Sequence, residues 1–304
     1  MERDRFLNKQ KLLQFFDKRR QRKESLVLAT VVETQGSTYS KTGDQMLIDE
    51  SGVGCGILSG GCLEGDLAVR AQVVLESGRS QVVTYDLASE DDDIWGMGIG
   101  CDGSMRVYLQ ALVPRTDYQP FVEIADVLRG NIEANVTIGG IDDELSIAIR
   151  IQPPLNLLVL GAGLDSVPVT KFADELGWRC TIFDHRPAYV DNANFPASSV
   201  THCAEASLLA ATVELDHFDC AIVMSHHLVS DRTYLSQLAE CSIPYIGLLG
   251  PSARRERLLS EIGDAADKLR DRLHAPAGLD IGGRGPEPIA LSIVAQMQQA
   301  FTRG

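Results

Sequence analysis

The sequence predicts a mixed α/β protein, in which a small N-terminal α/β domain precedes a Rossmann-like domain with a doubly wound parallel sheet. Three observations indicate this fold. After Pro153 and Pro154, short apolar segments alternate with amphipathic ones, which is typical of a parallel sheet covered by helices on both faces. Before that pair, strand-like segments are separated by glycine-rich turns. The length of 304 residues is sufficient for two domains.

The N-terminal domain is expected to span residues 1–114. Four of its segments have the apolar, β-branched composition of strands: "LVLATVVET", "QMLIDESGVGCGIL", "SQVVTYDL" and "MRVYLQALV". The segment "LEGDLAVRAQVVLESG" instead predicts a helix that ends at Gly78. A connecting region, 115–153, contains a predicted helix at 121–128 and two strand signals, "ANVTIGG" and "LSIAIRI".

The C-terminal domain, 154–304, shows the alternation most plainly. Its predicted strands are "NLLVLGAG", "RCTIFDHR", "FDCAIVMSHH" and "PYIGLLG", and its predicted helices are "SVPVTKFADELGW", "DRTYLSQLAEC", "SARRERLLSEI" and "PEPIALSIVAQMQQAF". In such a fold, ligands bind outside the carboxyl ends of the strands, at the point where the strand order reverses.

The stretch "GCGILSGGCLEGDL", residues 54–67, concentrates five glycines, two cysteines and two carboxylates before the first predicted helix. The turn Ser59, Gly60, Gly61 and Cys62 leads into the start of that helix near Leu63. An uncrowded backbone at the positive end of a helix favours an anion. Cys62 is then either a thiol with a lowered pKa or a small packed apolar residue.

Candidate ligand-binding residues also follow three strands of the C-terminal domain. Gly161 and Gly163 begin a G-x-G-x-x-S sequence, and Asp184 ends the next strand, where a dinucleotide fold keeps its ribose-binding acid. His226 or His227 follows a third strand and is expected at the same edge of the sheet. These residues predict a nucleotide-type site, and the missing third glycine leaves open a Rossmann fold retained only as a scaffold.

Arg254 and Arg255 lie in the first turn of the helix after "GLLG". Guanidinium groups beside free backbone N–H groups suit a phosphate or a carboxylate. An arginine pair at the surface is the alternative.

Composition excludes several classes of function. The formal net charge of −14 argues against a nucleic-acid partner. No apolar run approaches the roughly 18 residues of a membrane span, and the N-terminus does not have the order of a secretory signal. We therefore expect a cytoplasmic protein without a membrane partner, whose seven cysteines are reduced thiols.

Six motifs in order, "GSTYSKTGDQML", "SGGCLEG", "GIGCDG", "GAGLDSVPVTKFADELGW", "YIGLLG" and "RLHAPAGLDIGGRGPEPIALSI", resemble the xanthine dehydrogenase accessory (XdhC/CoxI) family over nearly the whole chain. The resemblance implies a maturation factor without turnover of its own. It would bind the molybdenum cofactor (molybdopterin), assist its sulfuration by a cysteine desulfurase-type sulfur donor, and insert it into the apo-enzyme of a xanthine or CO dehydrogenase-type molybdenum hydroxylase. We also expect a homo-oligomer.

The family motifs place the cofactor at particular residues of this chain. Cys62 and Cys101 match motif cysteines, and Cys101, flanked by glycines that include Gly103, is the expected metal ligand. Glu64 matches as well, either as a helix cap or as a hydrogen-bond acceptor for the pterin. We expect the turn 98–103 to face the turn 59–62 across a cleft that holds the cofactor. The remaining cysteines are expected in the core: Cys55, Cys180, Cys203, Cys220 and Cys241.

One departure from the family concerns Leu164, where many members have histidine, so a metal or acid–base role for that histidine is not carried over. Two other classes of function remain as alternatives. One is an NAD(P)-dependent oxidoreductase that uses Gly161, Gly163 and Asp184, with His226 transferring a proton. The other is a structural or regulatory partner protein.

Overall fold

The structure is a computed structural model that describes residues 8–86, 103–139, 145–192 and 194–302. The chain divides into two compact units, residues 1–154 and 155–304. Each unit contains its own sheet and its own hydrophobic core. Cys101 and the rest of 87–102 lie outside the described residues.

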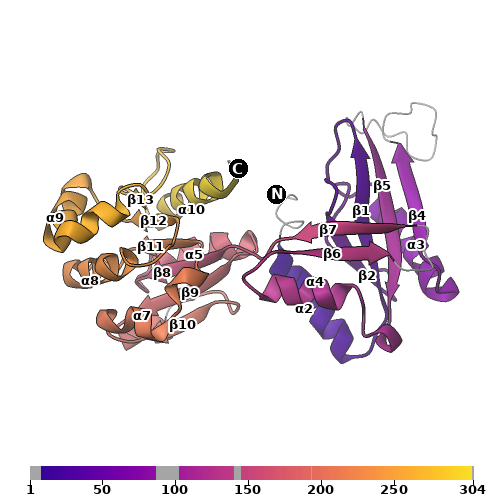
Figure 1. The fold of residues 1–304 in the computed structure, drawn as a ribbon, viewed down its shortest axis with the longest axis horizontal. Helices are drawn as coiled ribbons and strands as arrows, with labels where there is room; N and C mark the ends of the chain where they lie inside the picture. The colour runs from indigo at the N-terminus through magenta and orange to yellow at the C-terminus, as the bar shows by residue number, and fades with distance from the viewer. Residues whose placement is uncertain (1–7, 87–102, 140–144, 193, 303–304) are drawn as a thin grey trace. The chain divides into compact units, whose positions relative to one another are not determined.

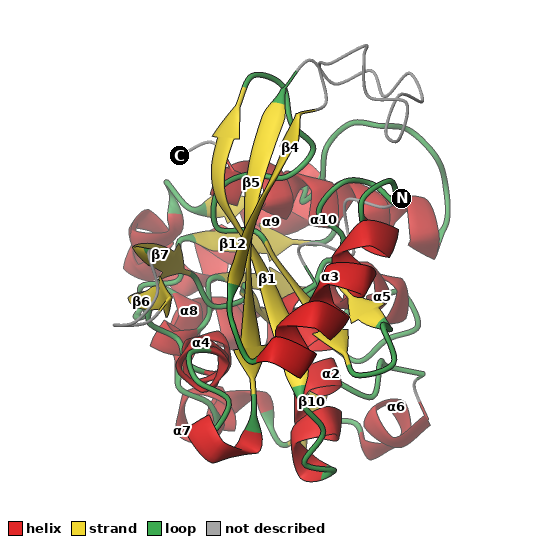
Figure 2. Ribbon diagram, turned by 90° about the vertical axis from the view of Figure 1, so that its right-hand side faces the viewer, coloured by secondary structure: helices red, strands yellow, loops and turns green. Residues whose placement is uncertain are grey.

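The first unit is built on a five-stranded antiparallel sheet in the order β3-β2-β1-β5-β4. Figure 2 shows its long strands with helix α3 packed across them. The elements of this sheet and its helices are β1 (Leu26–Gln35), β2 (Gln45–Asp49), β3 (Gly54–Cys55), β4 (Gln81–Asp86), β5 (Ser104–Leu112), α2 (Lys9–Gln21), α3 (Glu64–Ser77), η1 (Pro114–Thr116) and α4 (Phe121–Arg129).

Both faces of this sheet are buried, because successive side chains of a strand point to opposite faces. Val27, Ala29 and Val31 of β1 pack against α3. Leu26 and Leu28 pack instead against α2, α4 and the hairpin β6 (Ala134–Gly139) and β7 (Ser146–Ile151). The segment expected as a connecting region, 115–153, thus completes the core of the first unit.

Helix α3 follows the predicted span and ends at Gly78, which adopts the left-handed conformation with a φ of 66°. Its buried residues, Leu67, Ala71 and Val74, recur with helical spacing. Val69 and Val73 lie on the opposite face and are 64% and 53% exposed.

The second unit contains a six-stranded parallel sheet in the order β10-β9-β8-β11-β12-β13, which confirms the predicted Rossmann-like architecture. Figure 1 labels its strands and most of its helices. The elements of this unit are β8 (Asn156–Leu160), α5 (Ser166–Glu175), β9 (Arg179–Asp184), α6 (Pro187–Asn192), β10 (Val200–Cys203), η2 (Ala206–Leu208), α7 (Leu209–Thr212), η3 (Leu215–His217), β11 (Cys220–Val223), α8 (Leu228–Leu238), β12 (Tyr245–Leu248), α9 (Ser252–Ile262), η4 (Gly263–Leu269), β13 (Leu273–His274) and α10 (Pro286–Thr302).

Helices cover both faces of this sheet. Helices α5 and α10 pack on one face through Val169, Ala173 and Ile293. Helix α8 packs on the other through Tyr234 and Leu235. The strand order reverses between β8 and β11, as it does in dinucleotide-binding folds, so the loops after these two strands enclose the place where a ligand is expected.

Candidate functional site

The turn Ser59–Cys62 is held in shape by Glu64, the first residue of α3. One carboxylate oxygen of Glu64 accepts hydrogen bonds from the N–H groups of Leu58 at 2.8 Å and Ser59 at 2.9 Å. The other accepts from the Ser59 hydroxyl at 2.7 Å, and that hydroxyl accepts from the N–H of Leu63 at 2.8 Å. The Glu64 carboxylate thus bonds donors of the turn that precedes α3, whereas no side-chain hydrogen bond caps the start of that helix.

The middle of the turn is open. Gly60 and Gly61 have φ values of 79° and 114°, a conformation that favours glycine. A Cβ atom at Gly61 would meet no atom within 4 Å, and one at Gly60 would lie 3.6 Å from the ring of Tyr39. Cys62 is exposed. Among the described residues, none accepts a hydrogen bond from the N–H groups of Gly60, Gly61 or Cys62, so these donors are free to bind an anion.

Gly103 lies at the start of β5, two residues after Cys101. A Cβ atom at Gly103 would lie 2.6 Å from the carbonyl oxygens of Gln35 and Ser37. The loop that begins at Gln35 therefore packs directly against Gly103. The same loop contains Tyr39, whose ring lies next to Gly60. Gly103 and Gly60 thus both lie against this loop.

A polar network ties the end of β4 to the first turn of α3. The Tyr85 hydroxyl donates to the carboxylate of Asp66 at 2.6 Å, and Arg70 donates to the same oxygen. Burial, with a further contribution from the hydrogen bond to Asp66, raises the pKa of Tyr85. Strand β4 leads directly into the segment that contains Cys101, so this network fixes the chain near the turn Ser59–Cys62 just before that segment begins.

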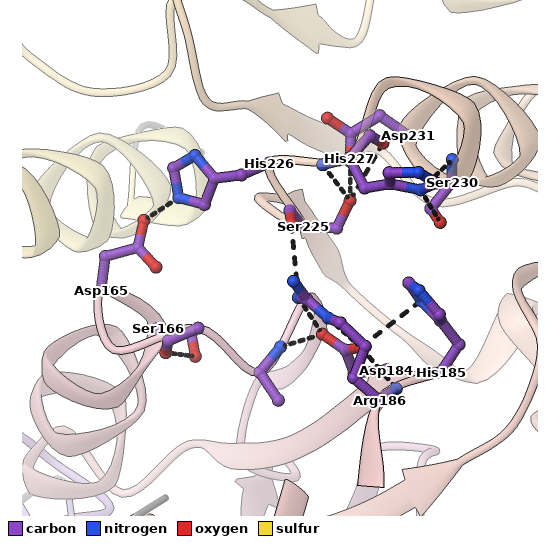
Figure 3. Close-up of polar contacts among 12 residues, drawn as sticks. Asp165, Ser166, Asp184, His185, Arg186, Ser225, His226, His227, Ser230 and Asp231 are labelled. Atoms are coloured by element: carbon purple, nitrogen blue, oxygen red, sulfur yellow. Dashed lines mark hydrogen bonds and ion pairs between the residues drawn. The ribbon is translucent and has the colours of Figure 1, made fainter. Parts of the chain in front are cut away.

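In the second unit, the structure brings Gly161, Gly163, Asp184 and His226 together at the carboxyl edge of the sheet. Figure 3 shows Asp184 and His226 there. A Cβ atom at Gly161 would lie 2.7 Å from the backbone of Met224, so only glycine allows the loop after β8 to pass this close to the end of β11. This grouping is the one predicted from the strand ends. We call it the switch-point cluster and include in it Asp165, His185, Arg186, Ser225, His227 and Asp231.

The Asp184 carboxylate is fully buried and already bonded. One oxygen accepts from the N–H of Ala162 at 2.7 Å and from Arg186 Nη2 at 2.6 Å. The other accepts from the N–H and Nε of Arg186, both at 2.9 Å. Burial favours a raised pKa, but these hydrogen bonds more than offset it and hold the Asp184 pKa below its ordinary value. A ribose hydroxyl would have to displace one of these donors.

His226 and Asp165 form a pair across the cluster. His226 Nε2 lies 2.6 Å from Asp165 Oδ2, and the side chains are 62% and 19% exposed. His226 has a φ of 58°, which is uncommon for a residue with a side chain. A Cβ atom at Gly163 would lie 2.7 Å from Asp165 Oδ1, so glycine makes room for the carboxylate.

Arg254 is engaged with a buried acid. Its Nη2 donates to Asp231 at 2.7 Å, and the Ser225 hydroxyl donates to the other oxygen of Asp231. Asp231 is 1% exposed, so the guanidinium neutralises a charge within the fold. The predicted use of Arg254 for an external anion stays a prediction.

Sequence reasoning missed five members of this cluster: Asp165, His185, Arg186, Ser225 and Asp231. His185 Nδ1 lies 3.5 Å from Asp184 Oδ1, and no described residue forms a hydrogen bond with it. Tyr234 lies beneath the cluster with its hydroxyl buried and without a partner among the described residues. The sequence "DHR" at the end of β9 could have indicated His185 and Arg186, because charged residues directly follow a buried strand there.

The cysteines divide by burial. Cys180 and Cys220 lie in the core, where burial raises the pKa of Cys180 to about 12 and that of Cys220 well above its ordinary value. Cys55 and Cys241 are half-buried. The prediction of a core position is wrong for Cys203, which is exposed, because it ends the edge strand β10, which is exposed for most of its length.

Three further findings concern the described part of the chain. Within the described ranges, no three His, Cys, Asp or Glu side chains are grouped so that they could bind a metal ion. A cavity of about 760 Å³, lined by residues that include His217 and Cys241, lies where β11 begins and α8 ends, at the opposite edge from the switch-point cluster. No helix in the described part of the chain is both long and apolar enough to span a membrane.

Known proteins resemble the chain along most of its length. Residues 157–297 match the family described as "XdhC Rossmann domain", and residues 19–86 match the "XdhC and CoxI family". A Bacillus subtilis (strain 168) protein, named as a probable xanthine dehydrogenase subunit, is 31% identical, over 92% of this chain and 94% of its own. "Molybdenum cofactor insertion chaperone PaoD" of Escherichia coli (strain K12) is 25% identical, over 89% and 82%. A crystal structure described as a xanthine dehydrogenase from Bacillus halodurans superimposes with a TM-score of 0.82 at 30% identity, over 96% of both chains.

Proposed function

Because the chain belongs to the XdhC and CoxI family, we propose that it binds the molybdenum cofactor and inserts it into the apo-enzyme of a molybdenum hydroxylase of the xanthine or CO dehydrogenase type. The names of its relatives, a molybdenum cofactor insertion chaperone and a xanthine dehydrogenase subunit, support a maturation role. A chaperone needs no turnover of its own. Its residues hold the cofactor, shield it from water and release it.

The open turn Ser59–Cys62 is the observation that carries this proposal. The cofactor is an anionic phosphorylated pterin, and the free N–H groups of Gly60, Gly61 and Cys62 stand at the start of α3, where the helix dipole favours an anion. Both oxygens of the Glu64 carboxylate accept hydrogen bonds from residues of the turn. We therefore propose that Glu64 positions the free N–H groups and does not itself contact the cofactor. The residues present therefore fit the phosphate end of the cofactor.

The metal end requires a soft ligand, and Cys101 is the proposed thiolate. Its structure lies outside the described residues, but both ends of its segment are anchored beside the turn. Gly103 packs against the loop that reaches Gly60 through Tyr39, and Tyr85 is tied to Asp66. When bound, the cofactor would supply the molybdenum centre that the client uses. This chain would supply binding and protection.

The proposed partners follow from this role. Insertion requires contact with the apo-hydroxylase, and exchange of an oxo for a sulfido ligand requires a cysteine desulfurase-type sulfur donor. We propose a homo-oligomer as the form that meets them, and an additional nucleotide-type ligand at Gly161 and Gly163 of the second unit. An oxidoreductase that uses Asp184 to bind ribose is disfavoured, because that carboxylate is already fully bonded.

The test is the molybdenum content and oxidised-pterin fluorescence of protein purified from molybdenum-replete cells. Wild type should carry both, and Cys101→Ser should lose most of the molybdenum while it keeps the fold. Gly61→Val should lose both, because valine is strained at a φ of 114° and would reshape the turn.

Gly65→Ala is the matched control, since a Cβ atom there meets no atom within 4 Å and its backbone is helical. It should retain the cofactor. Retention of wild-type amounts by both Cys101→Ser and Gly61→Val would contradict the proposal. Activation of a co-expressed apo-hydroxylase should follow the same order of variants.

A further inference from the structure

The switch-point cluster contains three carboxylates, and each already has a cationic or histidine partner. Asp165 bonds His226, Asp231 bonds Arg254, and Asp184 bonds Arg186 (Figure 3). Two of these acids, Asp184 and Asp231, are 0% and 1% exposed. The charges of Asp184 and Asp231 are therefore neutralised by arginines within the cluster.

Arg186 is the donor whose position is best defined. Its Nε and Nη2 donate hydrogen bonds to the Asp184 carboxylate, and Nη2 also lies 3.3 Å from the carbonyl oxygen of Ser225. The side chain consequently reaches from the end of β9 to the end of β11, across the place where the strand order reverses. Its guanidinium carbon lies 4.1 Å from the centre of the Tyr189 ring. The hydrogen bonds to Asp184 and the contact with this ring together fix the plane of the guanidinium.

One edge of this guanidinium stays available. Arg186 Nη1 donates to no acceptor among the described residues, and the side chain is 28% exposed. His185 does not add a second available group, because its Nδ1 is buried and lies 3.5 Å from Asp184 Oδ1. A fixed, partly exposed guanidinium suits an oxyanion with several acceptor atoms.

The same contacts exclude the usual recognition of an unphosphorylated ribose. The acid that would accept a ribose hydroxyl bonds directly to the N–H of Ala162, within the loop that such a ribose would approach. A ligand selected here has to be recognised by Arg186 instead. In folds of this order, an arginine near the end of the second strand accommodates a phosphate on the ribose.

We propose that Arg186 makes the second unit selective for a phosphate monoester on a nucleotide or pterin ligand. This chemistry has two sources, the ribose phosphate of NADP and the terminal phosphate of the molybdenum cofactor's pterin. The cofactor has one terminal phosphate, so the pterin source would place that phosphate at Arg186 instead of at the turn Ser59–Cys62. This source rests on the cofactor binding proposed above, whereas the NADP source is independent of it.

The experiment compares two pairs of ligands that differ by one phosphate monoester. Titration calorimetry on the full chain measures NADP⁺ against NAD⁺, and fluorescence titration measures the oxidised pterin before and after phosphatase treatment. In at least one pair, the phosphorylated member should bind at least about tenfold more tightly, because each charge-assisted hydrogen bond contributes on this scale. The pair that shows the preference identifies the source.

Arg186→Ala and Arg186→Gln should reduce the preference to less than about threefold. The glutamine keeps a donor for Asp184 and removes the charge, and unchanged binding of the unphosphorylated member shows that the unit is folded. Arg270→Ala is the matched control, because Arg270 is 77% exposed, lies just before β13 and pairs with Asp267. It should keep the full preference.

Equal binding within both pairs, or a preference that survives both Arg186 variants, would overturn the inference. Neither result would bear on the cofactor site proposed in the first unit. Failure of the proposed chaperone function would appear as loss of molybdenum from wild type, while an NADP preference would persist.

Discussion

Glu64→Ala is expected to destabilise the first unit and to release the cofactor. The substitution removes the acceptor of three hydrogen bonds, from the N–H groups of Leu58 and Ser59 and from the Ser59 hydroxyl. Hydrogen bonds to a charged group contribute about 1.5–3 kcal/mol each, and the turn is only partly buried, so water can replace some of them. The expected loss in the free energy of unfolding is about 2–4 kcal/mol.

For a unit of this size, that loss lowers the melting temperature by about 5–15 °C, which differential scanning calorimetry resolves. Glu64→Gln should cost only about 1 kcal/mol, because the amide oxygen still accepts from the two N–H groups. Glu76→Ala, an exposed position near the other end of α3, should change stability by less than about 0.5 kcal/mol. A melting temperature for Glu64→Ala equal to that of Glu76→Ala would refute the stabilising role of the Glu64 carboxylate in the turn.

Three further outcomes are expected. Gly103→Ala should cost about 1–3 kcal/mol in urea unfolding, since its Cβ atom would lie 2.6 Å from two carbonyl oxygens; an unchanged midpoint would show that the loop yields freely. Cys220→Ser, which puts a hydroxyl in a fully buried site, should cost about 1–3 kcal/mol and leave the molybdenum content unchanged. Because the pKa of Asp184 is lowered, its contribution to stability is complete above its unfolded value of about 3.9 and is lost as the pH falls through the folded value. Acid unfolding followed by circular dichroism should therefore begin at a higher pH in Arg186→Gln, and an identical onset would contradict this account.

The regular parts of the fold could be predicted because their patterns are strong. Strands β8, β9, β11 and β12 are short runs buried on both faces, and glycine turns separate them from amphipathic helices. The edge strands β10 and β13 were missed. They are four and two residues long and only partly buried, so they lack an apolar run.

The grouping of candidate residues could be predicted where the backbone determines their position. The ends of parallel strands must meet, which placed Gly161, Asp184 and His226 together. Prediction failed for side-chain partners, because the acids that bind Arg186 and Arg254 come from contacts that strand patterns do not encode. Cys203 was misplaced for a related reason, since an apolar neighbourhood in sequence does not show which strand lies at the edge.

The uneven burial of the cysteines makes the native chain its own reporter of local opening. An alkylating reagent can reach the exposed thiols of Cys62 and Cys203 directly, whereas Cys180 and Cys220 become reactive only when the second unit opens. The ratio of labelling rates at a buried and an exposed thiol therefore measures the free energy of that opening under native conditions. Half-buried Cys55 gives the corresponding reading for the first unit. Peptide mapping of one labelling time course would thus show whether a bound ligand protects one unit or both.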